Sequence, residues 1–471
     1  MPPAVTRTAK LFTGAMALAA ILGGCAAGAP SPVDLTVDLP KSYLNESKAL
    51  ALVSQSGLNT PLRYWWQGYG SSELNKLVER ALERNPDLKI ANSQVRQAKI
   101  RASQANAGAL PTVSVPARAA VGSGSGGEAL QNSQSGLQAN YRLDLWGERS
   151  YQIVSADQIV WRAVYERDNL MRTLIGSVVT TYIAYLVTCD QIVTSEENEK
   201  TAVDLQRTVE HRMALGEATI DELERQRDAL YQQQAVHSGL VNQKADLQNA
   251  LSRLLGVLPS ELIVTGGTVE QLTTPNVSAG IPATLLVNRP DIRAVEARML
   301  SANANIEVAR ARLLPPVDLA IQGGYNGLGI AQLFQPQNFF LNGVASLAAT
   351  IFDGGRLAAD KDLAQAAYED LVITYGQTVF QAVREVESAL GGWRAAQERL
   401  NSQSLSHRSA LNLFKSSSDA FALGAMDLAG QLSARRAYHR NLEDLRRTRG
   451  ELLRAYAAVF QALGGGWADN S

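Results

Sequence analysis

The chain has few of the residues that carry out chemistry. It contains two cysteines and four histidines in 471 residues, and no histidine stands near a cysteine, aspartate or glutamate at a spacing typical of metal ligands. No phosphate-binding glycine loop and no GxSxG nucleophile motif occurs. These absences argue against an enzyme, and we expect neither a cofactor nor a bound metal.

The chain also has little net charge and few long apolar runs. The formal net charge is −1, whereas nucleic-acid binding calls for a basic face, so we expect no nucleic-acid partner. After the N-terminal segment no run of about 20 apolar residues occurs, so we predict no membrane-spanning helix in the mature chain. Aromatic residues amount to 6%, and much of the apolar content is alanine, which favours close-packed helices over a broad globular core.

The N-terminus resembles a bacterial lipoprotein signal. Arg7 and Lys10 precede an apolar stretch that ends in the sequence LGGC at Cys25. We predict a signal peptide over residues 1–24, lipid attachment at Cys25 and a lipidated tether over residues 25–62. An alanine follows the cysteine, and the absence of aspartate there favours delivery to the outer membrane. The alternative is an ordinary signal peptide with an incidental cysteine.

Beyond the tether the chain contains two copies of one unit. NPDL at residues 85–88 matches RPDI at residues 289–292, and leucine–glycine pairs that break helices recur at nearly the same interval. The copies define a first repeat over residues 63–257, a linker over residues 258–287, a second repeat over residues 288–466 and a tail over residues 467–471.

Long proline-free stretches in both repeats carry apolar residues at helical spacing. They predict antiparallel helical hairpins over about residues 150–256 and 356–464, with reversals at Leu215–Gly216 and Leu423–Gly424. A helix of roughly sixty residues is about 90 Å long at 1.5 Å per residue. Shorter helices are predicted before each hairpin, and the one within residues 288–316 is closed by two consecutive prolines.

Between these helices the apolar period changes to that of a strand. The alternation predicts β-hairpins over about residues 112–146 and 317–353, with loops over residues 122–136 and 326–340. Each strand approaches the length of about 9–11 residues that a tilted membrane strand needs. Pro116 predicts a bulge in the first strand. The same alternation also fits the half-buried sheet of a soluble protein.

Together these features resemble the outer membrane factors, the TolC-like exit ducts, and within them the NodT-type efflux lipoproteins. The resemblance rests on the RPD-helix-PP stretch, the strand ends YRLDLWG and IFDGG, the segment RYWWQGYGSSEL at residues 63–74, and their order over about residues 64–466. It implies a mainly α fold with a membrane β component, in which long helical hairpins form a periplasmic tunnel. It also implies a homotrimer, a periplasmic adaptor protein and an inner membrane pump of the resistance-nodulation-division type.

The strands themselves also call for assembly. Four strands cannot close a barrel, and an open sheet edge in lipid leaves backbone groups without hydrogen bonds. Two chains would give eight strands, whose lumen side chains fill, whereas three give twelve and a passage. The family resemblance implies three, so we expect a twelve-stranded barrel whose apolar face contacts outer membrane lipid and whose polar face is wet.

The predicted function is that of a passive trimeric exit duct for small molecules, the outer membrane channel of a tripartite efflux system. An exit duct for secreted protein or peptide would use the same fold and is the second interpretation. A periplasm-spanning structural lipoprotein without conductance is the third.

In the family, hairpin tips contact the adaptor, and acidic residues just past the second tip narrow the closed tube. The resemblance therefore assigns adaptor contact to the two leucine–glycine tips and a periplasmic constriction to Asp427. The tip residues are Leu215, Gly216, Leu423 and Gly424. The simpler alternatives are that the glycines only end helices and that Asp427 faces solvent near a helix start, where an acid is favoured anyway.

Overall fold

The computed structural model describes residues 62–123, 129–274, 289–327 and 334–465. The chain divides into two compact units, Met1–Asp38 and Leu39–Ser471, and every described residue belongs to the second. The predicted signal peptide, the lipid site at Cys25, nearly all of the tether, the second half of the linker and the tail lie outside the described residues.

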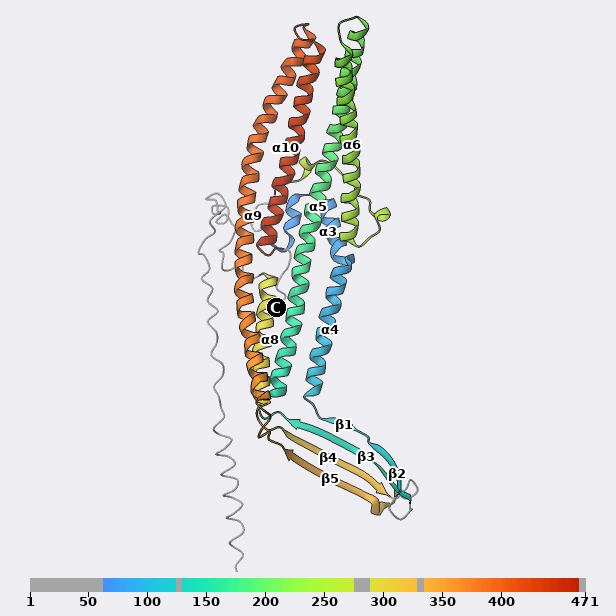
Figure 1. Ribbon diagram of the computed structural model, residues 1–471, viewed down its shortest axis with the longest axis vertical. Helices are drawn as coiled ribbons and strands as arrows, with labels where there is room; N and C mark the ends of the chain where they lie inside the picture. Colours follow the sequence, from blue (N-terminus) through green and yellow to red (C-terminus); the bar gives the residue numbers. More distant parts are fainter. Residues whose placement is uncertain (1–61, 124–128, 275–288, 328–333, 466–471) are drawn as a thin grey trace, which may run out of the picture. The chain divides into compact units, whose positions relative to one another are not determined.

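The described residues are mostly helical (Figure 1). The α-helices are α3 (Ser72–Arg84), α4 (Pro86–Gly108), α5 (Glu148–Ala214), α6 (Ile220–Leu255), α8 (Pro290–Ala311), α9 (Arg356–Ala422) and α10 (Leu428–Ala462). Short 3-10 helices are η2 (Leu62–Tyr69), η3 (Pro259–Glu261), η4 (Val269–Gln271) and η6 (Pro336–Asn338). The strands are β1 (Thr112–Ser114), β2 (Ala117–Ser123), β3 (Ala129–Leu143), β4 (Val317–Gly327) and β5 (Phe339–Leu347).

The two repeats fold alike. The helices α5 and α9 each contain 67 residues, and both start directly after a glycine with positive φ, Gly147 (φ 80°) and Gly355 (φ 88°). Both reverse at a glycine of the same kind, Gly216 (φ 78°) and Gly424 (φ 72°). Only glycine adopts this left-handed conformation without a steric penalty, so these four positions fix where the long helices start and turn. The predicted two-fold repeat and its helical hairpins are confirmed.

The returning helices are about half as long as the outgoing ones. They contain 36 residues in α6 and 35 in α10. The part of α5 that lies beyond α6 packs against α4 and α8, and the part of α9 that lies beyond α10 packs against α8 (Figure 1). One stretch of α5 is long and apolar enough to cross a membrane, but most of it is buried inside the protein, as in the core helix of a helical bundle.

The helix α8 ends about one turn earlier than the prolines Pro315 and Pro316 suggest. Its last residue is Ala311, which lies four positions before Pro315. A proline ring collides with the carbonyl group of the residue four positions earlier and also disfavours helical backbone in the preceding residue. The steric effect of Pro315 therefore reaches back to Ala311.

The strands form one antiparallel sheet in the order β1-β3-β4-β5, in which β2 also pairs with β3. The predicted loop over residues 122–136 is wrong, because β3 already begins at Ala129. Ser133 pairs with Ala119 on one side and with Gly327 on the other. Residues 129–136 are mostly polar, so apolar alternation does not mark them. Backbone pairing makes them a strand: residues 129–132 pair with β2 and residues from 133 on pair with β4 as well.

Hydrogen bonding also explains where the first and the last predicted strands are interrupted or end. The first predicted strand is interrupted at Pro116, but the predicted bulge is wrong: Ser114 pairs with Gln138 and Ala117 with Ser135, so no extra residue is inserted on either strand. The last strand ends at Leu347, which pairs with Val317, rather than near residue 353. The two prolines before Val317 have no amide hydrogen with which to continue the ladder.

The sheet register separates polar from apolar rows. Arg142 lies opposite Asp318, which lies opposite Ser346, and the guanidinium of Arg142 donates to both carboxylate oxygens of Asp318 at 2.7 and 3.1 Å. The row Tyr141–Leu319–Ala345 is apolar. Because side chains alternate between the faces of a strand, one face of the sheet is polar and the other apolar.

The core joins the two repeats. Trp65 in η2 is fully buried and stacks on Phe460 of α10 with ring centroids 5.2 Å apart. The hydroxyl of Tyr69 donates to the carbonyl of Leu453, also in α10, at 2.8 Å. Buried aromatic rings contribute large apolar areas to a core. The start of the first repeat therefore packs into the core of the second repeat.

The described part of the linker is held by two carboxylates. Glu73 of α3 accepts hydrogen bonds from the backbone N–H and the hydroxyl of Thr265 at 2.7 and 2.6 Å. Asp190 of α5 accepts from the N–H of Val269 at 2.9 Å and from the hydroxyl of Thr268 at 3.1 Å. These bonds hold residues 258–274 against the first repeat.

Candidate functional site

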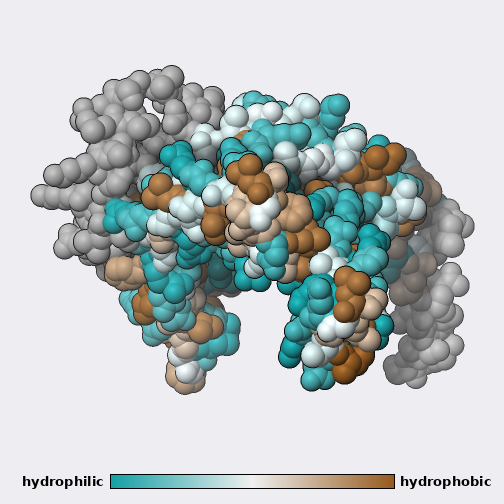
Figure 2. Space-filling view, turned by 90° about the horizontal axis from the view of Figure 1, so that it is seen from above, coloured by the Kyte–Doolittle hydropathy of each residue, from teal (hydrophilic) through white to brown (hydrophobic). Residues whose placement is uncertain are grey.

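The hairpin tips present apolar side chains to solvent. Leu215 is 74% exposed and Leu423 is 83% exposed. Met213, Ile220, Phe421 and Met426 near the same turns are exposed as well. Figure 2 looks onto the end where the tips lie and shows hydrophobic residues scattered among hydrophilic ones. Around each turn, however, three exposed apolar side chains lie within a few residues of one another, and such a local group is suited to contact another protein.

The glycines of the tips are required by the backbone. Gly216 and Gly424 have φ values of 78° and 72°, and a Cβ atom added to either would meet no atom within 4 Å. Gly216 donates to the carbonyl of Met213 and Gly424 to that of Phe421, both at 3.0 Å. The glycines therefore serve the reversal of the chain, and the adjacent leucines are the side chains that a partner could contact.

Asp427 is the N-cap of α10. Its carboxylate accepts a hydrogen bond from the N–H of Gly430 at 2.8 Å, and its side chain is exposed. Thr219 caps α6 in the first repeat by accepting from Glu222 at 3.3 Å. In a single chain Asp427 thus has the role of a helix cap. A ring of Asp427 carboxylates needs symmetry-related chains, so its part in a constriction stays a prediction.

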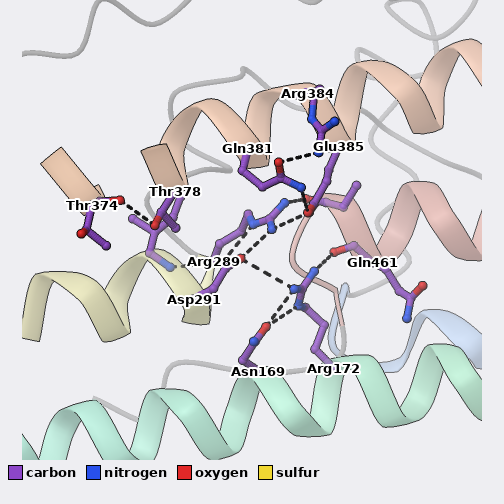
Figure 3. A network of polar contacts seen from close by, with 12 residues as sticks. Asn169, Arg172, Arg289, Asp291, Thr374, Thr378, Gln381, Arg384, Glu385 and Gln461 are labelled. Carbon is purple, nitrogen blue, oxygen red and sulfur yellow. Dashed lines mark hydrogen bonds and ion pairs between the residues drawn. The ribbon is translucent and has the colours of Figure 1, made fainter. Parts of the chain in front are cut away.

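A buried network of charged groups joins the opposite end of α10 to three other helices (Figure 3). The side chain of Arg289, immediately before α8, is 1% exposed. Its guanidinium donates to Asp291 at 3.1 and 2.6 Å, to Glu385 of α9 at 2.7 Å and to the carbonyl of Ala462 at 2.9 Å. One arginine therefore forms ion pairs with two acids and satisfies a carbonyl at the C-terminus of α10.

Arg172 of α5 completes this network. It donates to the carbonyl of Gln461 and to the side chain of Asn169, and one of its nitrogens lies 3.8 Å from Asp291. Together with Arg289 it caps the last carbonyls of α10, where positive charge is favoured by the helix dipole. We call Arg172, Arg289, Asp291 and Glu385 the α10 anchor.

The protonation of the anchor follows from burial and charge. Burial alone would raise the pKa of the Asp291 carboxyl, but the hydrogen bonds and charge of Arg289 outweigh it and hold that pKa below its usual range. Burial likewise raises the pKa of the Glu385 carboxyl, but hydrogen bonds from Arg289 and Gln381 and the charge of Arg289 outweigh it, so this pKa is lowered as well. Burial and the neighbouring charge of Arg289 lower the pKa of Arg172. Both acids are therefore ionised at neutral pH.

Comparisons with known proteins agree with this geometry. The sequence model of the family described as "Outer membrane efflux protein" matches residues 77–257 and 281–465. The outer membrane protein OpmQ of Pseudomonas putida, named for pyoverdine export, is 31% identical over 460 residues, which is 95% of this chain and 96% of that protein. The chain belongs to the outer membrane efflux protein family.

More distant relatives fit the same assignment. CusC of Escherichia coli, named a cation efflux system protein, is 25% identical over 97% of this chain and 99% of its own length. The solved structure of the OprN outer-membrane channel matches with a TM-score of 0.82 at 24% identity, over 92% of this chain and 98% of that one. The MtrE channel of Neisseria gonorrhoeae matches with a TM-score of 0.80 at 23% identity, over 93% and 98%. The structural likenesses establish the fold.

The channel is therefore the outer membrane component of an efflux system, and it extends from the outer membrane into the periplasm. Members of its family are channel proteins that form trimers and work in tripartite systems. The sequence-based assignments of family, fold, function and location are confirmed.

Sequence reasoning missed the α10 anchor. Arg289 and Asp291 were part of a motif, but their pattern predicted only a helix start. Arg172 stands in an otherwise apolar part of α5, and an arginine in such a stretch is a signal for a buried ion pair. Its partners lie in helices far along the channel's sequence, so no local pattern names them.

Proposed function

We propose that three copies of the channel close one twelve-stranded barrel and form a passive exit duct, with no enzymatic step of its own. The observation that carries this is the pair of sheet edges: within the described strands, β5 pairs only with β4, and β1 and β2 pair only with β3. In lipid each unpaired backbone group costs several kcal/mol. Pairing β5 of one copy with β1 and β2 of the next removes both edges, and twelve strands leave a lumen open.

The two faces of the sheet indicate which side of the barrel wall would face water and which would face lipid. The polar row Arg142–Asp318–Ser346 would face a water-filled lumen, and the apolar row Tyr141–Leu319–Ala345 would face lipid. Arg142 is the next-to-last residue of β3, at the end of the sheet that leads into α5, so on the lipid face its charge would cost about 0–1 kcal/mol near the interface and about 2–4 kcal/mol if it lay at mid-membrane depth. The opposite orientation is therefore disfavoured.

We infer a small-molecule cargo, delivered by an inner membrane pump of the resistance-nodulation-division type through a periplasmic adaptor. Relatives named for pyoverdine export and for cation efflux support a small cargo. The purified channel should conduct ions in planar bilayers, and absence of conductance would leave the structural-lipoprotein interpretation. A deletion strain that gains drug susceptibility supports the efflux duct, whereas one that only loses secreted protein supports a secretion duct.

We further propose that the tips dock on the adaptor through Leu215 and Leu423. Their exposure, on turns fixed by glycine, supports this. A photo-crosslinking residue at either position should capture the adaptor in cells. The same residue at Ile263, which is 86% exposed but lies in the linker, is the matched control. Capture that is equal at Ile263 and at the tips, or absent from the tips, would refute the docking site.

The last part of the proposal is that three Asp427 carboxylates narrow the closed tube near the tips. Their exposure next to the tip supports this, because carboxylates brought around a three-fold axis repel one another and attract cations. Asp427 also caps α10. A test of the constriction must therefore remove the charge and keep the cap.

A further inference from the structure

A polar cavity of about 330 Å³ lies between α5, α6 and α10. It thus lies where a helix of the second repeat meets the helical hairpin of the first (Figure 1). Its lining is unusual for the space between packed helices, because few of the side chains are apolar. Lining residues are Ser195, Asn198, Ala229, Gln232, Gln233, Val236, Leu240, Arg436, Arg440 and Glu443.

Two arginines on the cavity wall lack ion pairs. Arg436 and Arg440 stand one helical turn apart on α10, and among the described residues neither forms a salt bridge. The Nη2 atom of Arg436 is closed off from solvent and has no hydrogen-bond partner. Burial and then the charge of Arg440 lower the pKa of Arg436. Two like charges that repel each other, neither of them in an ion pair with a described residue, outweigh the one acid of the lining, Glu443, and leave the cavity suited to an anion.

The remaining polar groups of the cavity indicate which second chemical group a bound anion would carry. Glu443, the one acid in the lining, accepts from Gln191 at 3.2 Å. Asn198 contributes an amide oxygen that is also closed off from solvent and has no donor. An amide oxygen accepts hydrogen bonds, so a ligand that carries both negative charge and an O–H group would satisfy it together with the arginines.

We propose that this cavity binds a small oxyanion that also carries a hydroxyl donor, such as hydrogenphosphate or a hydroxycarboxylate. Arg436 and Arg440 would bind the oxyanion, because guanidinium groups match the geometry of phosphate and carboxylate oxygens. The hydroxyl would donate to Asn198. Arg440 is exposed, so the cavity can be reached from solvent.

A bound anion also has a structural consequence. It connects α10 to α5 across the interface that is otherwise joined by polar contacts such as Arg435–Glu197 at 3.0 Å and Gln191–Glu443 at 3.2 Å. It also removes the repulsion between Arg436 and Arg440. The anion therefore stabilises the contact between the two helical hairpins.

The test is isothermal titration calorimetry of the purified trimer in detergent with inorganic phosphate, and separately with citrate, in chloride buffer at pH 7. Wild-type protein should give saturable binding. Arg436→Gln and Arg440→Gln should each weaken it about tenfold or more, as expected for loss of one charged hydrogen bond. Arg436→Lys should weaken it less. Arg447→Gln, on the exposed side of α10 and paired with Asp444, is the control and should bind as wild type.

Sulfate tests the role of Asn198, because it has no O–H donor at this pH. Wild-type protein should bind phosphate more tightly than sulfate, and Asn198→Ala should abolish that difference. Helical circular dichroism and the size of the trimer show that each variant is folded.

Three results would overturn the proposal. Titrations without saturable heat would mean that the cavity holds only water. Equal weakening by Arg447→Gln would mean nonspecific attraction. A destabilised Arg436→Gln trimer combined with no anion binding by the wild type would mean that a side chain of a neighbouring subunit fills the cavity instead.

Discussion

Replacing Arg289 with methionine is the sharpest test of the α10 anchor. Methionine keeps most of the aliphatic volume but removes the hydrogen bonds to Asp291, Glu385 and the Ala462 carbonyl. Removing one partner of a buried ion pair costs about 3–5 kcal/mol, because the other charge is left uncompensated. The side chains of Asp291 and Glu385 are 24% and 38% exposed, so water compensates part of the loss. We expect a destabilisation of about 2–4 kcal/mol.

The assay is thermal unfolding of the purified protein in detergent. At an unfolding entropy of about 2.1 cal/mol/K per residue, 1 kcal/mol corresponds to about 1 °C for 471 residues. Arg289→Met should therefore lower the Tm by about 2–4 °C. Arg447→Met on the exposed face of α10 is the control and should stay within about 0.5 kcal/mol of wild type. If Arg289→Met behaves like this control, the anchor does not hold α10.

The same network predicts a pH dependence. The pKa values of Asp291 and Glu385 are lowered in the folded state. Their contribution to stability is therefore complete above the ordinary carboxyl pKa of about 4 and is lost as the pH falls through the lowered values. The Tm difference between wild type and Arg289→Met should shrink below about pH 4. A difference that stays constant from neutral to acid pH would contradict the ionic origin of the stabilisation.

A double variant separates the two arginines. Arg172 lies 3.8 Å from Asp291 and can compensate part of the loss when Arg289 is removed. Arg172→Met combined with Arg289→Met leaves both acids without a cation. Its cost should exceed the sum of the two single costs, since residues in one network are not additive.

Three further predictions concern other parts of the channel. Asp427→Ser keeps a good helix cap but removes the charge, so it should reduce cation selectivity in bilayer recordings as much as Asp427→Ala does; unchanged selectivity in both would place the constriction elsewhere. Cys25→Ser should abolish acyl labelling and signal processing, and undiminished labelling would refute lipid attachment at this residue. Gly216→Ala should destabilise the fold by about 1–2 kcal/mol, because alanine is strained at a left-handed φ. Gly256→Ala should destabilise it more, because its Cβ would in addition lie 2.5 Å from the carbonyl oxygen of Arg84. Equal Tm values for the two glycine variants would show that the backbone at Arg84 moves away from the added Cβ.

Much of the fold could be predicted because its signals are local. The reversals at Gly216 and Gly424 and the change of period at the strands depend on backbone conformation over a few residues. The predicted helical hairpins agree with the long helices within a few residues at each end. The internal repeat strengthened every such prediction, because each pattern could be checked against its second copy.

Tertiary structure decided what depends on distant partners. Residues 129–136 form a strand because β2, and from Ser133 on also β4, supply hydrogen bonds, which a polar sequence does not predict. Arg172 and Arg289 become a cap for α10 only when four helices meet, and Arg436 and Arg440 share a cavity only because α10 packs against the first repeat. The sequence by itself determined the family, the repeat and the turns, since these are encoded in short stretches of chain. Packing alone determined which charged groups lie together, since burial and partners are set by contacts between segments far apart in the sequence.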